Sequence, residues 1–462
     1  MSTHLVILGA GITGLAAAWE AVSGNRRDDR HITVTILEAS GRAGGLVKTS
    51  DFLGAQIDEA ADAFLARVPE AIELCKELGL QDRFTHPKAT RAKVWDGRQL
   101  RWFPKTSVMG IPLDMDDLKA TGLLSDQGRA DVAAEQNRQF EIPATDTSIG
   151  AFLQERFGHE LVAKVVGPLV GGISAGEVDQ MSLMAVLPQV ADASKAAGAG
   201  SLSDELRRRA ASADSGAPIF NALIGGTQTL TDALVERLES RGVDIRLNSA
   251  VQSISRDSQG VQLNGPWGAL HADRVLICTS AAVASELLEP ISETAAAEVG
   301  SIGTASATMV AMAFPRDVEI DPEMSGFLIP RGAGLTLTAV SVGSSKWSHW
   351  GDGEHLLLRT SVGHRTDRGA ALMEEPQLLD AIQNDLSRTL GIERPAVASR
   401  ISRWIDGFHQ YDVGHLDRCD RIDSALASQS DGSIAVAGAA YRGMGIPACI
   451  RQGRLGARAL LT

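Results

Sequence analysis

Residues 4–24 read HLVILGAGITGLAAAWEAVSG and combine a strand, a glycine turn and a helix in that order. The apolar run up to Leu8 is typical of a buried strand, and the alanine-rich stretch after the turn is typical of a helix. Between them, Gly9, Gly11 and Gly14 form the pattern GxGxxG. Glycines at these positions allow the backbone to approach a pyrophosphate group that lies on the N-terminus of the following helix. The stretch therefore predicts a dinucleotide-binding unit.

A second strand is predicted over residues 32–37, ITVTIL, where β-branched and apolar residues alternate. Glu38 follows it directly, at a position where a carboxylate can accept hydrogen bonds from the ribose hydroxyls of an adenosine. The charged connector at residues 25–31 explains why Glu38 lies slightly beyond the usual spacing of about 20 residues. An exposed glutamate can be merely solvated, and GxGxxG can arise by chance in a chain with 47 glycines. Strand, helix and acid together favour the ligand.

The run EASGRAGG, residues 38–45, comes immediately after the second strand. Arg42 can pair with a phosphate, and Gly44 and Gly45 let the chain pass close beneath it. A second segment at the diphosphate is superfluous for a simple nicotinamide dehydrogenase. The run therefore favours FAD over NAD.

The rest of the chain predicts an α/β fold with discontinuous domains. An amphipathic helix is expected over 69–80, strands over 305–363, a helix over 375–390, and a mobile Ala-, Gly- and Ser-rich stretch at 191–217. The expected domains are a Rossmann-type FAD-binding domain (1–65, 217–290 and 400–462), a mixed-sheet substrate domain (66–87 and 291–399) and a mainly helical insertion (88–216).

Composition narrows the function classes. The 462 residues carry 44% hydrophobic and 22% charged residues and a formal charge of -13, without a basic run that would track nucleic acid. The four cysteines are widely separated and form no CxxC, so neither a disulfide framework nor a zinc site is expected. No stretch approaches about 18 uninterrupted apolar residues. We expect a cytoplasmic protein without a metal site; peripheral membrane contact is not indicated but stays open.

Several segments resemble known flavoproteins. The run at 38–45 resembles the ExxxRxGG stretch of the flavin amine oxidase superfamily, and residues 223–238, 248–251 and 434–450 are similar to further segments of it. Within it the chain resembles the protoporphyrinogen oxidase family over nearly its whole length, and more narrowly the bacterial branch that makes coproporphyrin. The likeness rests on DAFLARVPEAIELCKELGL, PLVGGISAGEVDQMSL, GSSKWSHWGD, SRWIDGFHQYDVGHLD and YRGMGIPACI, the last similar to YxGxGIPxC.

The resemblance implies noncovalent FAD. It places the backbone of Val251 at the adenine, Gly438 at the phosphates or ribityl chain, and the N-terminus of a helix starting near Ile446 at the N1/O2 region of the isoalloxazine. A positive helix end there stabilises anionic reduced flavin. The expected cofactor-binding residues are Gly9, Gly11, Ile12, Thr13, Gly14, Glu38, Ala39, Arg42, Gly44, Gly45, Leu46, Val251, Gly438, Gly445, Ile446 and Pro447.

The resemblance also implies oxidation of coproporphyrinogen III to coproporphyrin III in haem biosynthesis, by hydride transfer to flavin N5 and with dioxygen reduced to hydrogen peroxide. Arg67 matches a basic residue that follows a Phe-Leu pair in the family, and with Tyr441 and Ser174 it is a candidate anchor for the substrate. No catalytic acid or base is assigned. Arg67 can also be a surface arginine at a helix start, Tyr441 can merely pack near the flavin, and His415 is expected to be structural. Handover to a ferrochelatase stays open.

Three alternatives remain: a protoporphyrinogen IX oxidase, an amine oxidase or desaturase on the same fold, and an FAD-bound protein that has lost turnover. The aromatic content of 4% disfavours an amine-binding aromatic cage. The chain departs from the family pattern at Ala60, where glycine is expected, at Ser174, where tyrosine is expected, and at His409, where proline is usual. The first two segments are expected near the substrate side of the pocket.

Overall fold

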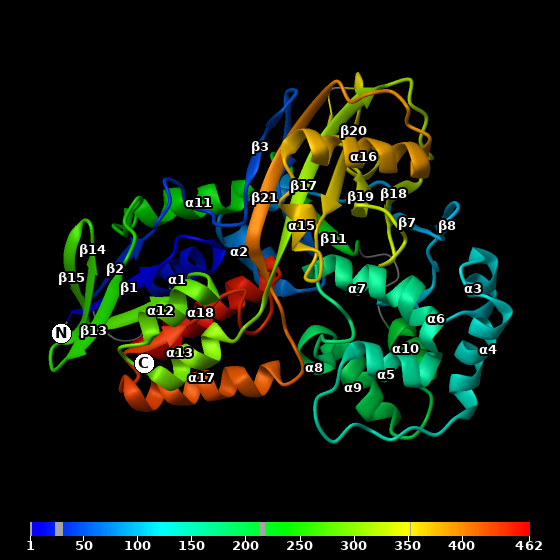
Figure 1. Cartoon of the computed structure of the whole chain (residues 1–462). Helices are drawn as coiled ribbons and strands as arrows, with labels where there is room; N and C mark the ends of the chain where they lie inside the picture. The colour runs from blue at the N-terminus through cyan, green and yellow to red at the C-terminus, as the bar shows by residue number, and fades with distance from the viewer. Residues whose placement is uncertain (1, 24–30, 213–217, 352) are drawn as a thin grey trace.

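The computed structural model describes residues 2–23, 31–212, 218–351 and 353–462. Figure 1 shows an α/β lobe that holds both chain ends, a large sheet covered by α16, and a group of helices between α3 and α10. The predicted α/β class is confirmed. Most of the charged connector at 25–31 and the end of the stretch at 191–217 lie outside the described residues.

The α/β lobe is built on a five-stranded sheet in which all neighbouring pairs are parallel. Its order is β12 (Asp244–Arg246), β2 (Ile32–Leu37), β1 (Thr3–Leu8), β16 (Arg274–Ile277) and β22 (Ile434–Val436). A parallel sheet must be covered on both faces, which explains the buried, mainly apolar runs at the ends of β1 and β2 and in β16, whereas the edge strand β12 is largely exposed. Strands from three distant parts of the sequence thus form one sheet, as the return of the α/β pattern at both later segments predicts.

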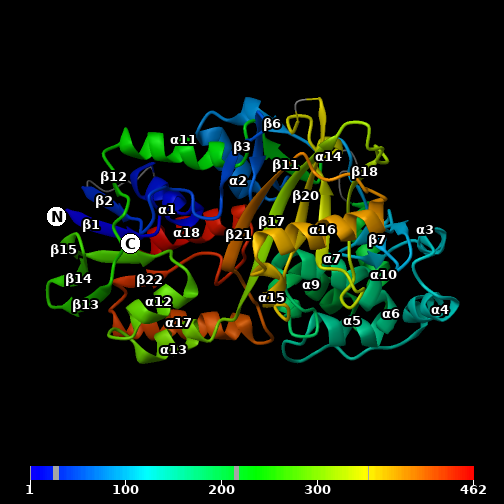
Figure 2. The ribbon, with the colours of Figure 1, turned by 45° about the horizontal axis from the view of Figure 1, so that its top comes forward.

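Helices cover both faces of this sheet (Figure 2). Leu5 and Ile7 of β1 face a core shared by α1 (Ile12–Ser23), α2 (Pro69–Glu77), α11 (Gln228–Glu239) and α18 (Ile446–Leu461). Val6 and Leu8 face the opposite core, which contains α12 (Ala281–Leu288), α13 (Glu293–Gly300) and α17 (His415–Gln429). The antiparallel strands β13 (Ser253–Asp257), β14 (Gly260–Gly265) and β15 (Gly268–Ala272) pack at one end of it.

The second sheet has seven strands and is antiparallel except for the β18–β7 pair. Its order is β21 (Ala398–His409), β17 (Thr304–Pro315), β20 (His355–Val362), β19 (Leu337–Val342), β18 (Met324–Leu328), β7 (Arg91–Trp95) and β8 (Leu100–Trp102). The predicted helix at 375–390 is confirmed as α16 (Glu375–Leu390), whose Leu378, Ile382 and Leu386 pack on the sheet.

Short elements connect the two sheets and the helices. They are β3 (Thr49–Phe52), β4 (Ala55–Asp58), β5 (Phe64–Leu65), a 3-10 turn (Gln81–Arg83), β6 (Phe84–Thr85), β9 (Ser107–Val108), β10 (Ile111–Pro112), β11 (Phe220–Leu223), α14 (Gly343–Lys346) and α15 (Arg368–Ala371). β11 pairs with both β5 and β6, which ties residues 64–85 to the α/β lobe.

The helical layer begins later than the sequence predicted. Its elements are α3 (Met115–Thr121), α4 (Asp126–Ala134), a 3-10 turn (Glu135–Asn137), α5 (Ile149–Phe157), α6 (His159–Leu161), a π segment (Val162–Val166), α7 (Gly167–Ser174), α8 (Leu183–Val186), α9 (Pro188–Ala197) and α10 (Leu202–Ala211). Residues 91–112 form strands instead, and two of these extend the seven-stranded sheet. The expectation of a mobile stretch is wrong for its described part, because α9 and α10 bury apolar residues in the helical core. The division into three domains stays a prediction.

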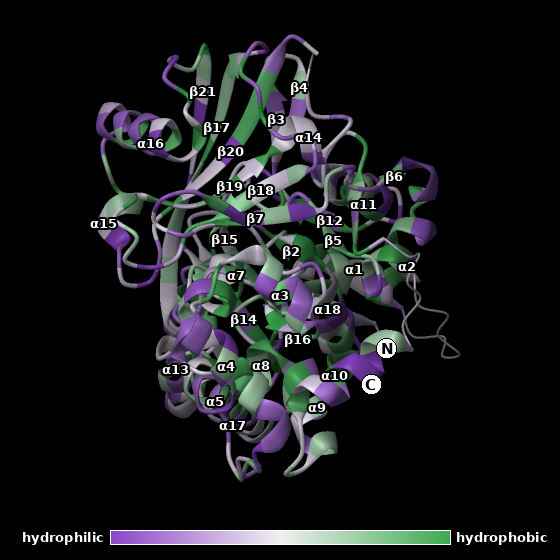
Figure 3. Ribbon diagram, turned by 90° about the vertical axis from the view of Figure 1, so that its right-hand side faces the viewer, coloured by the Kyte–Doolittle hydropathy of each residue, from purple (hydrophilic) through white to green (hydrophobic). Residues whose placement is uncertain are grey.

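The outer helices carry polar surface. In Figure 3, hydrophilic colour covers much of α16. Among the described residues, no helix combines the length and the apolar character that a membrane crossing requires.

An ion pair lies inside the helical layer. Arg156 of α5 and Glu135 are 1% and 0% exposed, and their closest charged atoms are 3.5 Å apart. Glu135 also accepts from the Ser201 hydroxyl at 2.8 Å and from the Leu202 amide at 2.6 Å. The pair therefore ties α5 to the start of α10.

We expect Arg156→Met to lower the free energy of unfolding by about 3–5 kcal/mol, because it leaves the Glu135 carboxylate buried without its cation. Chemical denaturation followed by circular dichroism measures this. The matched control is Arg394→Met, which removes an arginine from the exposed pair with Asp317 and is expected to change stability by less than about 1 kcal/mol. Equal costs for the two variants would contradict the assignment.

Candidate functional site

The glycine turn lies at the carboxyl ends of β1 and β2, where parallel α/β sheets bind ligands. The Gly9 amide donates to Leu37 O at 2.8 Å, which joins the turn to the end of β2. The Gly44 amide donates to Ala10 O at 2.8 Å, and Gly11 and Gly44 form a parallel bridge. The structure thus brings together the two glycine-rich segments that the sequence suggested for the diphosphate.

The three glycines of the turn have different reasons to be glycine. A Cβ atom on Gly14 would lie 2.0 Å from Gly9 O, and one on Gly9 would lie 2.8 Å from Cys278 O. These two positions are therefore required by the fold itself. A Cβ on Gly11 would meet nothing closer than Gly45 Cα at 4.0 Å, so the polypeptide leaves room beside Gly11. Open space of this kind beside a glycine turn is what a diphosphate needs.

Glu38 lies at the same edge of the sheet. Its carboxylate accepts from the Ala10 amide at 2.8 Å and from the Ser40 amide at 2.8 Å. The Ser249 amide donates to Glu38 O at 2.7 Å, which places the segment that contains half-buried Val251 next to the acid and Ala39. The acid and the proposed adenine-contacting segment are therefore neighbours.

The guanidinium of Arg42 is turned toward its own loop. Nη1 donates to Ala43 O at 2.9 Å, and Nη2 donates to Gly45 O. In this arrangement Arg42 holds the GRAGG turn in shape. Gly44 and Gly45 both have positive φ, at 107° and 57°, which a glycine adopts without strain. Leu46 follows them on the surface.

The C-terminal motif approaches the turn from the other side. α18 begins after Gly445, with Pro447 in its first turn and no side chain capping its free amides. A Cβ on Gly453 would lie 2.2 Å from Thr13 O, so α1 and α18 are packed backbone to backbone. Gly438 has φ 139°, and a Cβ there would lie 3.8 Å from the Thr13 hydroxyl. The first turn of α1 thus packs against the middle of α18, and Gly438 lies beside the same turn.

Asp58, Glu59 and Asp62 form a cluster of buried carboxylates. The segments around Lys346 and around Trp404, which also belong to the quoted motifs, meet the cluster. Asp62 accepts from Lys346 Nζ at 2.9 Å and from Trp347 Nε1 at 3.0 Å, and Arg359 Nη2 lies 3.2 Å away. These cations hold the pKa of Asp62 well below its usual range despite burial. The segment at 58–62 is thereby fixed against the seven-stranded sheet.

The pKa values of the two neighbouring carboxyl groups, Asp58 and Glu59, shift in opposite directions. Burial raises the pKa of Asp58, although Thr49 and Thr227 donate hydrogen bonds to it. The pKa of Glu59 is lowered instead, against the effect of burial, by donors that include Ser50, Lys48 and Ser402. The Trp404 indole donates to Glu59 O at 3.1 Å, so the cluster also binds β21.

The three candidate substrate anchors lie in different settings. Arg67 is exposed immediately before α2. Ser174 is buried at the end of α7, and Tyr441 is buried in the core against α12 and α17; neither hydroxyl has a partner among the described residues. No hydrogen bond or ion pair between described residues joins the three. The sequence alone does not identify Lys346, Trp347 and Arg359 as the partners of Asp62. Nor does it identify the other tyrosine, Tyr411, as a site residue. The rarity of tyrosine, with two in the chain, was the available signal for Tyr411.

Two buried histidines lie near the C-terminal motif. His409 Nε2 is 3.4 Å from the Ala281 amide, and His415 Nε2 is 2.6 Å from Tyr441 O. The setting of His415 is that of a core residue. Burial lowers the pKa of each histidine to about 4. Both are therefore neutral at pH 7.

We expect stability to fall between pH 6.5 and pH 5, because the unfolded state, with a histidine pKa of about 6.5, binds protons that the folded state excludes. The stabilisation is complete above pH 6.5 and is lost as the pH falls toward 4. Each histidine contributes on the order of 1–2 kcal/mol to the loss by pH 5. Thermal melts at pH 7.5 and 5.0 measure it, and His409→Gln should show a smaller drop than the unaltered protein. An identical drop would contradict the assignment.

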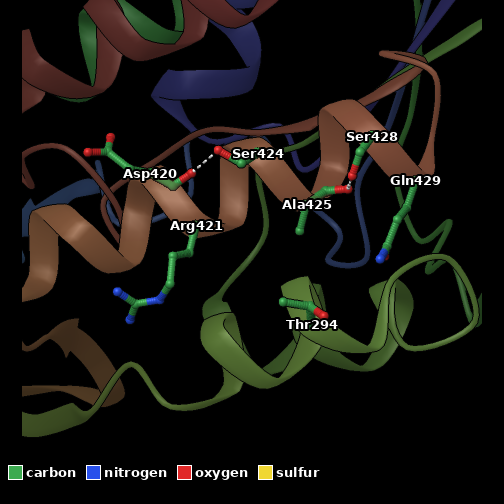
Figure 4. Close-up of a pocket in the computed structure, with 7 residues that line it drawn as sticks. All are labelled: Thr294, Asp420, Arg421, Ser424, Ala425, Ser428 and Gln429. Carbon is green, nitrogen blue, oxygen red and sulfur yellow. Dashed lines mark hydrogen bonds between the residues drawn. The ribbon is translucent and has the colours of Figure 1, made fainter.

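A separate groove lies between α13 and α17 (Figure 4). It is lined by Thr294, Asp420, Arg421, Ser424, Ala425, Ser428 and Gln429. None of the sequence-predicted site residues lines it. The described residues also contain no group of three or more His, Cys, Asp or Glu side chains that could hold a metal ion.

Comparison with known proteins agrees with this geometry. Residues 12–461 match the family described as flavin containing amine oxidoreductase. The chain is 30% identical to the coproporphyrinogen III oxidase of Bacillus subtilis (strain 168), over 99% of this chain and 98% of that protein. It is 33% identical to the coproporphyrinogen III oxidase of Mycobacterium leprae (strain TN), over 97% and 96%. A crystal structure of a protein from Exiguobacterium sp. 255-15, assigned as a protoporphyrinogen oxidase, superposes with a TM-score of 0.89 and 32% identity, over 99% and 98% of the two chains.

Proposed function

The chain belongs to the flavin containing amine oxidoreductase family, and on that basis we propose that it uses FAD to oxidise coproporphyrinogen III to coproporphyrin III. The proposed substrate rests on the similarity to bacterial coproporphyrinogen III oxidases, which extends over almost the entire chain at 30–33% identity. Dioxygen is the proposed electron acceptor, and hydrogen peroxide is the proposed second product. The reaction belongs to haem biosynthesis, and we place it in the cytoplasm with a ferrochelatase as a partner for the product.

The residues at the sheet edge fit a noncovalent FAD. The open space beside Gly11 fits a diphosphate, and the uncapped amides of α18 fit the electron-rich end of a flavin ring. Glu38 is proposed to exchange its present backbone partners for ribose hydroxyls. The proposed FAD-binding set is Gly9, Gly11, Ile12, Thr13, Gly14, Glu38, Ala39, Arg42, Gly44, Gly45, Leu46, Val251, Gly438, Gly445, Ile446 and Pro447.

Bound flavin supplies the hydride acceptor and returns the electrons to dioxygen. The polypeptide contributes by positioning the macrocycle more than by a strong acid or base, and no residue is assigned to accept the pyrrole N–H protons. Amides at the N-terminus of α18 favour negative charge on the ring beside them. The network around Asp62 holds residues 58–64 in one place, and Arg67 follows them three residues later.

Arg67 is our first candidate for binding a propionate. Its guanidinium is exposed, has no partner among the described residues and can form a bidentate pair with a carboxylate. Ser174 is the second candidate, since its buried hydroxyl lacks a partner. The hydroxyl of Tyr441 is also unpaired but lies in the core, so it is the third.

The test begins with purified protein and its visible spectrum. Anaerobically prepared coproporphyrinogen III is then added in air while porphyrin fluorescence is followed. Flavin bands, with fluorescence that rises faster than without enzyme and faster than with protoporphyrinogen IX, support the proposal. Faster oxidation of protoporphyrinogen IX would instead favour that substrate. Flavin bands without acceleration for either compound would reject the function, and amines and polyenes become the next substrates to examine.

A further inference from the structure

The loop between β22 and α18 is held by the side chain of Tyr411. This residue follows β21 and is 2% exposed. Its hydroxyl donates to Ala439 O at 2.8 Å and accepts from the Gly443 amide at 2.9 Å. One side chain therefore bridges the two arms of the loop at 439–443, and two residues separate this loop from the start of α18.

Two other side chains hold the same loop. The His415 ring stacks on Tyr411 with centroids 4.0 Å apart, and its Nε2 lies 2.6 Å from Tyr441 O. Because that acceptor is a carbonyl, His415 must carry its proton on Nε2. Gln452 of α18 accepts from the Arg442 amide at 3.0 Å and donates to Gly443 O at 2.9 Å. The loop is thus fixed mainly through its backbone atoms.

The segment that carries Tyr411 is in turn bound to the helical layer. The Ser182 amide donates to Tyr411 O at 2.8 Å, and the Val413 amide donates to Gln180 O at 3.1 Å. The Gly414 amide donates to Asp146 Oδ2 at 2.8 Å. The backbone of this short segment therefore contacts segments that connect the helices, while the side chain of Tyr411 contacts the loop before α18.

We infer that Tyr411 is a positioning residue that fixes the loop at 439–443 and thereby sets the direction in which the N-terminus of α18 meets the flavin ring. This inference rests on the proposed function, because it takes the flavin to lie at the start of α18. The partial positive charge of a helix end acts only within its first turn. A small displacement of the loop therefore changes the stabilisation of reduced flavin more than it changes the fold.

The chain provides a matched control, because it has two tyrosines and both are buried. Tyr411 and Tyr441 are 2% and 4% exposed, yet only the first hydroxyl has partners among the described residues. Tyr411→Phe and Tyr441→Phe each remove one oxygen atom and keep the ring. A comparison of the two variants therefore measures the effect of the two hydrogen bonds that the Tyr411 hydroxyl forms with the loop.

For Tyr411→Phe we expect the dissociation constant of FAD to rise about tenfold, which corresponds to the loss of about one hydrogen bond. Reconstitution of the apoprotein with FAD measures it. We expect the flavin midpoint potential to become more negative, and kcat to fall with KM unchanged within about twofold. Tyr441→Phe should leave FAD affinity and potential unchanged, and it serves as a control for these two flavin readouts alone, because Tyr441 is itself a candidate for binding substrate. His415→Gln, which keeps a donor for Tyr441 O, should lie between the two.

The outcomes separate this inference from the proposed function. Equal FAD affinity and potential in Tyr411→Phe and Tyr441→Phe would overturn the role of Tyr411, whatever the substrate. A rise in KM alone would also overturn it, because that result indicates contact with substrate. Flavin binding that responds to Tyr411 in a protein that does not oxidise porphyrinogens would reject the proposed reaction and support the positioning role.

Discussion

Gly11→Ala is expected to give a folded protein that no longer retains flavin. The added methyl group has room in the polypeptide, where its nearest neighbour would be Gly45 Cα at 4.0 Å. It would project into the space proposed for the diphosphate, so we expect FAD affinity to fall at least about 100-fold, or about 2.7 kcal/mol. Absorbance after desalting measures flavin retention, and circular dichroism of the apoprotein measures folding.

Gly14→Ala is the contrasting variant. Its methyl group would lie 2.0 Å from Gly9 O, so we expect loss of folded protein rather than selective loss of cofactor. Two glycines three residues apart would thus fail in different ways. If Gly11→Ala keeps a normal flavin content, the diphosphate does not lie in the glycine turn. If Gly11→Ala fails to fold, glycine at position 11 is required by the fold and not only by the cofactor.

Asp62→Asn is expected to lower the free energy of unfolding by about 3–5 kcal/mol. The substitution keeps the shape of the side chain and removes the charge that faces Lys346 and Arg359, which are only 21% and 13% exposed. Because these contacts fix the segment that leads to Arg67, we also expect KM for the porphyrinogen to rise. Urea denaturation followed by tryptophan fluorescence and steady-state kinetics measure the two effects.

The control for Asp62→Asn is Asp317→Asn. Asp317 also pairs with an arginine, Arg394, but both side chains are 61% exposed. Solvent screens such a pair, so its loss should cost less than about 1 kcal/mol. The double variant Asp62→Asn with Lys346→Met should recover part of the stability, because it removes one of the unpaired cations. Similar costs for the two single Asp→Asn variants would mean that the cluster does not carry a buried charge.

Local patterns were sufficient for much of the fold. The apolar face of residues 375–390 predicts a helix, and the structure has α16 at these residues. The strands at 91–102 were missed, although Asp96-Gly97 between two apolar runs is a hairpin signal. Ala, Gly and Ser at 191–211 suggested mobility, yet small residues also allow helices to pack closely, as α9 and α10 do.

Pattern and spacing alone predict the candidate site only where its residues are close in sequence, and the distant segments at 248–251 and 434–450 come from the family resemblance. The glycine turn and Glu38 follow from one supersecondary unit. Asp62 is held by residues almost 300 positions away, and Tyr411 acts on a loop 28 residues later. Periodicity and motif spacing carry no information about such contacts, because they depend on how the two sheets and the helical layer pack together.

The order of strands in the parallel sheet affects how this protein folds while it is being synthesised. β22 pairs with β16, and α18 packs against α1, so the last 30 residues of the sequence complete a body that the first 30 begin. Domains tend to form from the N-terminus as a chain leaves the ribosome, but this lobe is incomplete until β22 and α18 have been synthesised. Until then one face of α1 lacks its partner and is open to chaperones. Flavin loading should therefore require that β22 and α18 have been synthesised, and chains truncated before β22 should be colourless and rapidly degraded.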